Sequence, residues 1–185
     1  MNMNKTPTLE TARLKLRPYS QADIAELVPL IGAREVAATT LRIPHPYTEQ
    51  DARDFLALLE DPSRIWLAIT LRHDGLQIGG VGLRVDEQHQ HAELGYWLGA
   101  PYWGKGYATE AAREMLRYGF ENLQLHRIFA SHFKHNPASG MILIKLGMRH
   151  EGCQREHLRK WDQFVDSELY GILRSEWEQD REVRE

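Results

Sequence analysis

Short runs in which apolar and polar residues alternate recur along this chain, and they predict strands with one buried face. The first run, at 12–17, reads Ala-Arg-Leu-Lys-Leu-Arg and is stopped by Pro18. Two longer runs flank residues 72–75, whose Asp-Gly pair favours a hairpin turn. Strands are therefore expected at 12–17, 65–71, 76–85, 91–98, 126–133, 148–155 and 167–174, the last two joined by a long connection.

Apolar residues spaced three and four apart predict helices with one buried face. Thr48 and Asp51 have the spacing of a capping box at the start of one helix. Asn136 followed by Pro137 is a typical start of another, and Gly147 is a typical end. Helices are expected near 20–32, 48–61, 108–123 and 136–147, so the order of elements is β-α-α-β-β-β-α-β-α-β-β.

Composition and charge narrow the class of protein. With 185 residues, the chain is long enough to bury one good core but short for two domains. Its 23 basic and 26 acidic residues are interspersed and give a net charge of −3, so direct nucleic-acid binding is not expected. The single cysteine, Cys153, and the lack of a long apolar run fit a cytoplasmic protein that does not enter membranes.

The two ends of the chain are more polar than its middle. Residues 1–10 are expected to be a flexible N-terminus, 11–177 a single domain, and 178–185 a charged tail. The highly charged stretch from Ser175 onward is expected to fray. For the oligomeric state, a monomer and a homodimer are both open.

The stretch 93–112 organises the chain, because a strand runs through a glycine-rich turn directly into a helix. Gly104 and Gly106 can take backbone conformations that other residues avoid, and they let the chain approach a ligand closely. The first amides of the helix have no partners inside it, and the helix N-terminus carries partial positive charge. This arrangement predicts a phosphate site made mainly of backbone N–H groups.

Two common phosphate-binding loops do not fit this stretch. The spacing of Gly104 and Gly106 lacks the third glycine of a dinucleotide loop, and the Gly-Lys-Ser/Thr of an ATP loop is absent. The sequence 103–111, Trp-Gly-Lys-Gly-Tyr-Ala-Thr-Glu-Ala, instead resembles the acyl-CoA loop of the GNAT N-acetyltransferases, most closely the branch with the ribosomal-protein N-terminal acetyltransferases. Pro101 departs from the general pattern, which has Gln or Arg there. For the loop taken by itself, a turn without any ligand is the alternative.

A second segment supports the same resemblance. Asn136-Pro-Ala-Ser139, followed by Leu146-Gly-Met148, looks like the family's Asn-x-x-Ser helix start and its later glycine. The order of elements matches the family layout over nearly the whole chain. The resemblance implies an α/β (α+β) fold with a central mixed, mostly antiparallel sheet, splayed between its fourth and fifth strands, and about four helices on both faces.

The resemblance also implies acetyl-CoA as co-substrate and no metal. The pantetheine arm would pair with the exposed edge of the strand at 91–98. For Lys105, a solvent-exposed loop charge is an equal alternative, because a nest of N–H groups needs no lysine. The residues that the resemblance assigns to acetyl-CoA are Tyr96, Trp97 and Leu98 for pantetheine, Gly104, Lys105, Gly106, Tyr107, Ala108 and Thr109 for the pyrophosphate, and Asn136 for the other side of the arm.

Two residues are candidates for catalysis. Attack on a thioester needs a neutral amine, and Glu93 is the best-placed carboxylate to take the amine's proton, directly or through water. The alternative for Glu93 is a surface ion pair with a residue such as Arg84. Ser139 matches the hydroxyl residue that this branch uses near the CoA sulfur, where a hydrogen bond helps the thiolate to leave. Helix capping is the alternative for Ser139.

The loop 41–47 is expected to face the acceptor, because in this fold the first two helices and their connection form one wall of the acceptor cleft. Arg42, His45 and Tyr47 are then candidates for binding the substrate, with an exposed loop as the alternative. The branch indicates the N-terminal α-amine of a protein or peptide as acceptor. Small-molecule amines and a non-catalytic domain that binds or senses acyl-CoA are the alternatives.

Other reactive side chains carry less weight. The pairs His89/His91 and His132/His135 have no Cys or carboxylate neighbours at a convincing metal-binding spacing, so no metal site is expected. Cys153 lies in an expected strand without a histidine partner, and it is expected to be buried.

Overall fold

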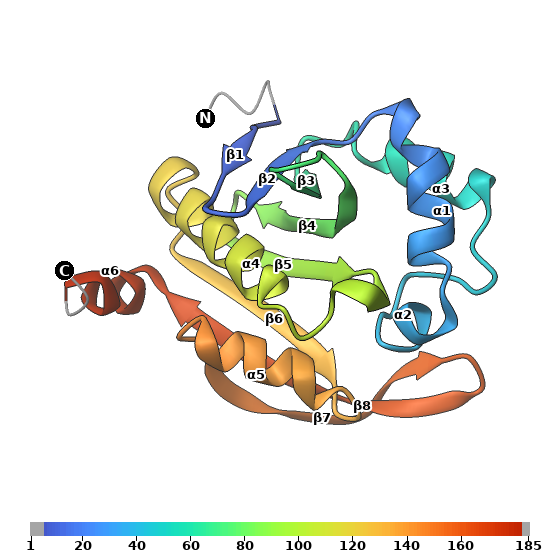
Figure 1. Cartoon of the computed structure of the whole chain (residues 1–185). Coiled ribbons are helices and arrows are strands. Elements are labelled where there is room, and N and C mark those ends of the chain that lie inside the picture. Colours follow the sequence, from blue (N-terminus) through green and yellow to red (C-terminus); the bar gives the residue numbers. More distant parts are fainter. Residues whose placement is uncertain (1–5, 183–185) are drawn as a thin grey trace.

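The alternating runs pair into one eight-stranded sheet with the order β1-β2-β3-β4-β5-β6-β8-β7 (Figure 1). A computed structural model describes the backbone of residues 6–182 and side chains as far as 179. Neighbouring strands are antiparallel except β5 and β6, which are parallel, so the predicted mixed, mostly antiparallel sheet is confirmed. The strands are β1 (Leu9–Glu10), β2 (Leu14–Pro18), β3 (Arg64–Leu71), β4 (Gln77–Asp86), β5 (His91–Leu98), β6 (Arg127–Phe133), β7 (Arg149–Lys160) and β8 (Gln163–Leu173).

β5 and β6 separate after three residue pairs. Their pairing runs from His91 and Arg127 to Glu93 and Phe129 and stops there, whereas β5 stays paired with β4 as far as Leu98. The backbone edge of β5 beyond Glu93 is therefore open on the side of β6. The predicted splay between these two strands is confirmed.

Helices cover the sheet from two sides, and each side has its own hydrophobic cluster. α4 and α5 bury residues such as Met115 and Leu143 in one cluster. α1, α2 and α3 form the other around Leu27 and Trp97, and Figure 1 shows them grouped apart from α4 and α5. No helix of the described chain is both long and apolar enough to cross a membrane. The helices are α1 (Ile24–Ile31), α2 (Arg34–Ala38), α3 (Glu49–Leu58), α4 (Tyr107–Arg117), α5 (Pro137–Lys145) and α6 (Arg174–Glu182).

Alternation along β5 links the two clusters. Successive residues of a strand point to opposite faces, so Leu94 and Leu98 join the cluster of α4 and α5, while Trp97 joins that of α1, α2 and α3. By the same parity, Tyr96 packs against the α4–α5 cluster and Glu93 lies on the face of Trp97. One strand thus presents side chains to both sides of the sheet.

The C-terminal strands are longer than predicted. Instead of a long connection, β7 and β8 pair as far as Lys160 and Gln163, which leaves a two-residue turn. A register shift between Gln154 and Leu158 interrupts the ladder, and Glu156 there has a φ of 48°. The segment is largely polar, so its sequence lacks the alternation that would reveal a strand.

The expectation that the chain frays from Ser175 is wrong for the described part of the tail. Residues Arg174–Glu182 form α6. Trp177 anchors this helix, because it is buried and its ring packs on Phe120 with centroids 5.8 Å apart. Residues 183–185 of the predicted tail lie outside the described residues.

Three smaller features also differ from the sequence predictions. Leu9 and Glu10, expected in a flexible end, form a short edge strand with β2, while residues 1–5 lie outside the described residues. The helix Arg34–Ala38 was not predicted, because five residues are too few to show a helical period. Cys153 lies in β7 as expected but is exposed rather than buried.

Candidate active site

A cavity of about 510 Å³ opens where β5 and β6 separate. Glu93 and Trp97 line it from one face of the sheet and Tyr96 from the other, so the cavity passes through the sheet at the splay. The connection between α2 and α3, the first turn of α5 and Leu158 of β7 also line it, as do residues of α3 and Trp66 of β3. Of the residues predicted for the site, the cavity brings together Arg42, Tyr47, Glu93, Tyr96, Trp97 and Ser139.

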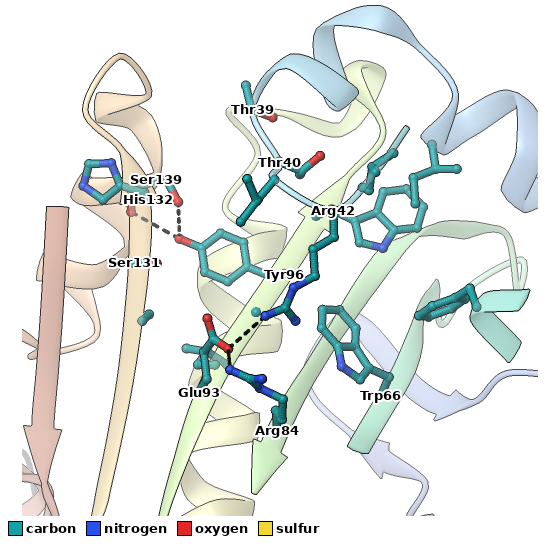
Figure 2. A pocket seen from close by; sticks show the side chains of 18 of the residues that line it. Thr39, Thr40, Arg42, Trp66, Arg84, Glu93, Tyr96, Ser131, His132 and Ser139 are labelled. Atoms are coloured by element: carbon teal, nitrogen blue, oxygen red, sulfur yellow. Dashed lines mark hydrogen bonds and ion pairs between the residues drawn. The ribbon is translucent and has the colours of Figure 1, made fainter. Parts of the chain in front are cut away.

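Tyr96 and Ser139 meet across the splay (Figure 2). The Tyr96 hydroxyl lies 2.7 Å from Ser139 Oγ and 3.2 Å from the Ser139 carbonyl oxygen. Burial raises the pKa of Tyr96 to about 12, although its hydrogen bond with Ser139 acts in the opposite direction. Tyr96 is therefore a neutral phenol that can donate to Ser139. The two residues lie 43 positions apart, so no local pattern in the sequence predicts this pair.

Asn136 caps the helix that carries Ser139. Its side chain accepts a hydrogen bond of 3.4 Å from Ser139 N at the start of α5. Because Asn136 fills the capping role, the Ser139 hydroxyl is left for Tyr96. Asn136 itself, predicted to reach the pantetheine arm, lies outside the cavity lining.

His132 lines the cavity from β6, although the sequence analysis considered it only as a metal ligand and expected no metal site there. Its Nδ1 lies 2.8 Å from Phe133 O, which makes Nδ1 the donor. Nε2 is buried and has no hydrogen-bond partner among the described side chains and backbone. A Cβ at Gly140 would lie only 2.7 Å from this atom, so the glycine makes room for the ring.

Glu93 forms the ion pair that was the alternative to a catalytic role. Arg84 Nη2 lies 2.7 Å and Arg42 Nη2 3.6 Å from the same carboxylate oxygen, Oε2. Arg84 stands opposite Glu93 in the β4–β5 ladder, whereas Arg42 reaches down from the connection between α2 and α3 (Figure 2). Three charged side chains from three segments thus converge in the cavity.

The predicted acceptor loop is turned only partly towards the cavity. Arg42 and Tyr47 line it, and burial raises the pKa of Tyr47 to about 12, with two nearby carboxylates acting in the same direction. His45 lies outside the lining, and its Nδ1 is 3.0 Å from Gly32 O. The structure therefore gives His45 a contact with the end of α1 rather than with the cavity.

The tip of the β7–β8 hairpin holds this loop. Lys160 Nζ donates to Ile43 O at 2.8 Å and lies 3.5 Å from Leu41 O. Burial lowers the pKa of Lys160. The sequence predicted an irregular connection around residue 160, so it gave no signal for this contact between distant segments.

The loop between β5 and α4 has the backbone conformation expected of an anion site. Gly104 and Gly106 have φ values of 73° and 80°, in the left-handed region that favours glycine. Gly106 is the N-cap of α4, and Glu110 N donates to Gly106 O at 3.0 Å. The N–H groups of residues 107–109 precede this bond, so they have no partner within the helix and are available to an anion.

Arg13 supports this loop through contacts that the sequence did not reveal. Its Nη1 donates to Lys105 O at 3.0 Å, and its guanidinium carbon lies 4.6 Å from the centre of the Tyr107 ring. Glu110 of α4 fixes Arg13 by accepting from its Nε at 2.7 Å. The partners are more than 90 residues apart, so local spacing could not predict them.

A shallow hollow beside the loop adds basic groups. Gly106 and Thr109 line it together with Arg113 of α4 and Lys145 of α5. The two basic residues were assigned no role from the sequence. Glu110 and Glu114 also line the hollow, but they pair with Arg13 at 2.7 Å and with Arg117 at 2.6 Å. The position of Arg113 and Lys145 next to the open amides of α4 therefore makes the hollow suitable for a further phosphate group.

The other predicted loop residues have structural contacts. Ala108 is buried beneath the loop, and Lys105 Nζ lies 5.7 Å from the centre of the Tyr102 ring. Leu98 is buried, and its carbonyl accepts a bond of 2.8 Å from Trp103 Nε1. Trp103 therefore ties the loop to the end of β5.

One group of potential metal ligands exists among the described side chains, those of residues 6–179, and it lies at the turn between β4 and β5. Ligand atoms of Asp86, His89 and His91 lie within 4.8 Å of one another. Asp86 is the carboxylate neighbour that the His89/His91 pair was expected to lack. Asp86 accepts from His89 N at 3.0 Å and lies 3.1 Å from His89 Nδ1, so the hairpin turn itself accounts for its contacts. None of the three lines the cavity.

Comparison with known proteins identifies the family. The model of the acetyltransferase (GNAT) domain matches residues 13–149. The uncharacterized N-acetyltransferase p20 of Bacillus licheniformis is 32% identical over 176 residues, which are 92% of this chain and 98% of that protein. The [ribosomal protein uS5]-alanine N-acetyltransferase of Escherichia coli is 34% identical over 84 residues, 45% of this chain and 43% of that enzyme.

The fold agrees with these matches. The crystal structure of a GNAT-family acetyltransferase from Bacillus anthracis superposes with a TM-score of 0.82 at 25% sequence identity, over 91% of this chain and 99% of that one. The loop motif, the splayed sheet and the family model therefore point to the same conclusion as the resemblance of residues 103–111. The chain belongs to the GNAT family of N-acetyltransferases, whose co-substrate is acetyl-CoA.

Proposed function

We propose that this enzyme transfers an acetyl group from acetyl-CoA directly to a primary amine, and that its preferred acceptor is the N-terminal α-amine of a protein or peptide. The observation that carries the proposal is the open edge of β5, which connects the glycine loop to the Tyr96–Ser139 pair. An extended chain can add to such an edge as another strand would. The edge ends where the cavity opens to both faces of the sheet.

The residues of this chain fit acetyl-CoA. The free amides of residues 107–109, with Gly104 and Gly106, suit a pyrophosphate, and the hollow with Arg113 and Lys145 suits a further phosphate. Tyr96, Trp97 and Leu98 offer the backbone edge for pantetheine. When bound, acetyl-CoA supplies an acetyl thioester, whose C–S bond breaks as the amine nitrogen bonds to the carbonyl carbon and CoA leaves as its thiolate.

Ser139 would stabilise the leaving thiolate, and Tyr96 would orient it. If the Tyr96 hydroxyl donates to Ser139 Oγ, the serine proton is free to point into the cavity. A thiolate with a reference pKa of about 8.5 is a tolerable leaving group, so one hydrogen bond is enough help.

Glu93 would act as the proton acceptor for the attacking amine. Its Oε2 holds Arg42 and Arg84, and its other oxygen would take the amine's proton, directly or through one water. An α-amine with a reference pKa of about 8 is partly neutral at pH 7, whereas a lysine amine at about 10.4 needs a stronger base. This difference supports an α-amine as acceptor. The Escherichia coli relative is named for alanine of a ribosomal protein, which agrees with that choice.

A panel of amines tests the proposal. Release of free CoA is measured with peptides that have a free N-terminus, with the same peptides blocked at the N-terminus but carrying lysine, and with small amines. We expect the free N-termini to react fastest. Faster reaction of the blocked peptides would contradict the α-amine preference, and faster reaction of small amines would support the small-molecule alternative. Tight acetyl-CoA binding, titrated in parallel, with no turnover on any amine would support a sensor.

A further inference from the structure

Two guanidinium groups share one carboxylate in the cavity. Arg84 and Arg42 both contact Glu93 Oε2, at 2.7 and 3.6 Å. Within the described residues, neither arginine forms an ion pair with any other carboxylate. Each guanidinium has five N–H donors. The three side chains together carry one surplus positive charge, and the side chains of Arg42 and Arg84 are 60% and 47% exposed.

The other charged residues of the lining are engaged with partners at its rim. Arg64 pairs with Asp61 at 3.3 Å. Asp51 caps the start of α3, and Asp54 accepts a bond of 2.7 Å from Gln50. The lining as a whole is formally neutral, because it holds three arginines, Arg42, Arg64 and Arg84, and three carboxylates, Asp51, Asp54 and Glu93. The excess of positive charge is local: it lies at Arg42 and Arg84, whose one carboxylate partner among the described residues is Glu93.

An aromatic wall stands next to the arginines. The rings of Phe55 and Trp66 pack edge to face with centroids 6.2 Å apart, and Trp97 lies in the same cluster. Figure 2 shows the Arg42 side chain directed into the cavity between Tyr96 and Trp66. The cavity thus combines donors for an anion with a surface for an apolar group.

We propose that the acceptor amine carries an anionic group close to the amine and an apolar group beside it. Arg42 and Arg84 bind the anion, Glu93 faces the amine, and the aromatic wall takes the apolar group. The anion is the carboxylate of a free amino acid or an acidic side chain following a peptide's N-terminal residue. This inference rests on the proposed acetyl transfer, and it disfavours polyamines, which would bring further positive charge to the two arginines.

Matched acceptors test the anionic requirement. Phenylalanine is compared with phenylalaninamide, and a Phe-Asp peptide amide with its Phe-Asn counterpart, by kcat/KM and by calorimetric binding in the presence of CoA. A hydrogen-bonded charge pair corresponds to about 10- to 100-fold in affinity, so we expect that preference for the anionic member of at least one pair. Preference within the first pair identifies a free amino acid, which would replace the peptide as the preferred acceptor. Preference within the second pair alone identifies a peptide.

Variants of Arg42 and Arg84 then test whether these two residues cause the preference for anionic acceptors. In Arg42→Gln and Arg84→Gln, the ratio of kcat/KM for the anionic and neutral acceptors should fall about tenfold or more. The control is Arg53→Gln, which removes an exposed arginine paired with Glu49 at 3.3 Å and outside the cavity lining. Its ratio should equal that of the wild type.

Three results would overturn the inference: neutral acceptors bound and acetylated as well as anionic ones, spermidine preferred to both, or a preference that survives in the arginine variants. The proposed acetyl transfer fails separately. Turnover would then be absent on every amine, while the binding titrations would still report whether the cavity selects anionic acceptors.

Discussion

The Tyr96 hydroxyl lies 2.7 Å from the Ser139 hydroxyl, so a residue of β5 touches the first turn of α5 across the gap in the sheet. The contact joins the two walls between which the acyl group would lie. Because the pKa of Tyr96 is raised to about 12, the phenol keeps its proton at physiological pH and can direct the serine proton. The pair therefore acts as a unit in the proposed chemistry.

Removing the Ser139 hydroxyl should slow the reaction without lowering the affinity for acetyl-CoA. We expect Ser139→Ala to lower kcat by about 10- to 100-fold, because the interaction matters as negative charge grows on sulfur. Tyr96→Phe should lower kcat less, since Ser139 remains. The control is Ser131→Ala, another serine of the cavity lining. Unchanged single-turnover rates in Ser139→Ala would leave Ser139 with a structural role.

The glycine loop can be tested by a single branched side chain. Gly106→Val should abolish acetyl-CoA binding in a folded protein, because Gly106 has a φ of 80° and lies at the open amides of α4. Gly75→Val is the matched control: its φ is 78°, but it lies in the β3–β4 turn. Calorimetry measures affinity, and circular dichroism measures folding. Normal affinity in folded Gly106→Val would disprove the loop assignment.

Glu93 has two proposed roles that pH profiles separate. As a proton acceptor, Glu93→Gln should lower kcat about 100-fold at neutral pH and recover partly as pH rises, because more of the amine is then neutral. As a holder of arginines only, it should change KM and leave the shape of the profile unaltered. Glu10→Gln, which removes an exposed partner of Arg72 at 3.7 Å, is the control.

Loss of the Lys160 contact should weaken binding of the acceptor amine more than binding of acetyl-CoA. Lys160→Met keeps the apolar stem but removes the donor to Ile43 O and Leu41 O. We expect the KM of the amine to rise about tenfold, because a hydrogen bond from a charged group is lost and the loop bearing Arg42 loosens. Acetyl-CoA affinity should stay within about twofold of the wild type, since the lysine is remote from the glycine loop. Equal losses for both substrates would contradict this division.

Alkaline titration can detect the buried phenol. The pKa of Tyr96 is raised from 10 to about 12, so its contribution to stability is present below pH 10 and is lost as pH rises to about 12. Tyrosinate absorbance of the wild type minus that of Tyr96→Phe should therefore show a late titration. A difference that titrates near pH 10 would mean that Tyr96 is solvated.

The fold and the backbone conformation of the glycine loop could be predicted well from sequence, because they depend on local patterns. β5 spans the predicted residues 91–98, and Gly104 and Gly106 have the left-handed backbone that their spacing suggested. A strand, a tight turn and the start of a helix each have a sequence pattern that spans only a few residues. The predicted splay also followed, through the family resemblance of the loop and the Asn136 segment.

The acceptor side could not be predicted in the same way, because it depends on contacts between distant segments. Arg42 and Glu93 lie on different elements, and Lys160 reaches a loop 117 residues away. His45 shows the limit of assigning a whole loop to a site, since its neighbours Arg42 and Tyr47 line the cavity and His45 does not. Side-chain direction within an irregular loop is set by tertiary packing, which leaves no period in the sequence.

The two hydrophobic clusters have a consequence for how this enzyme can diversify. The glycine loop and α5 rest on one cluster, and the loop with Arg42 rests against the other. Substitutions in α1, α2 or α3 can reshape the acceptor wall while the packing beneath the glycine loop stays intact. Selection for a new acceptor can therefore change one side of the sheet without loss of acetyl-CoA binding on the other. Where β5 and β6 separate, residues of both clusters meet, so substitutions there affect both substrates.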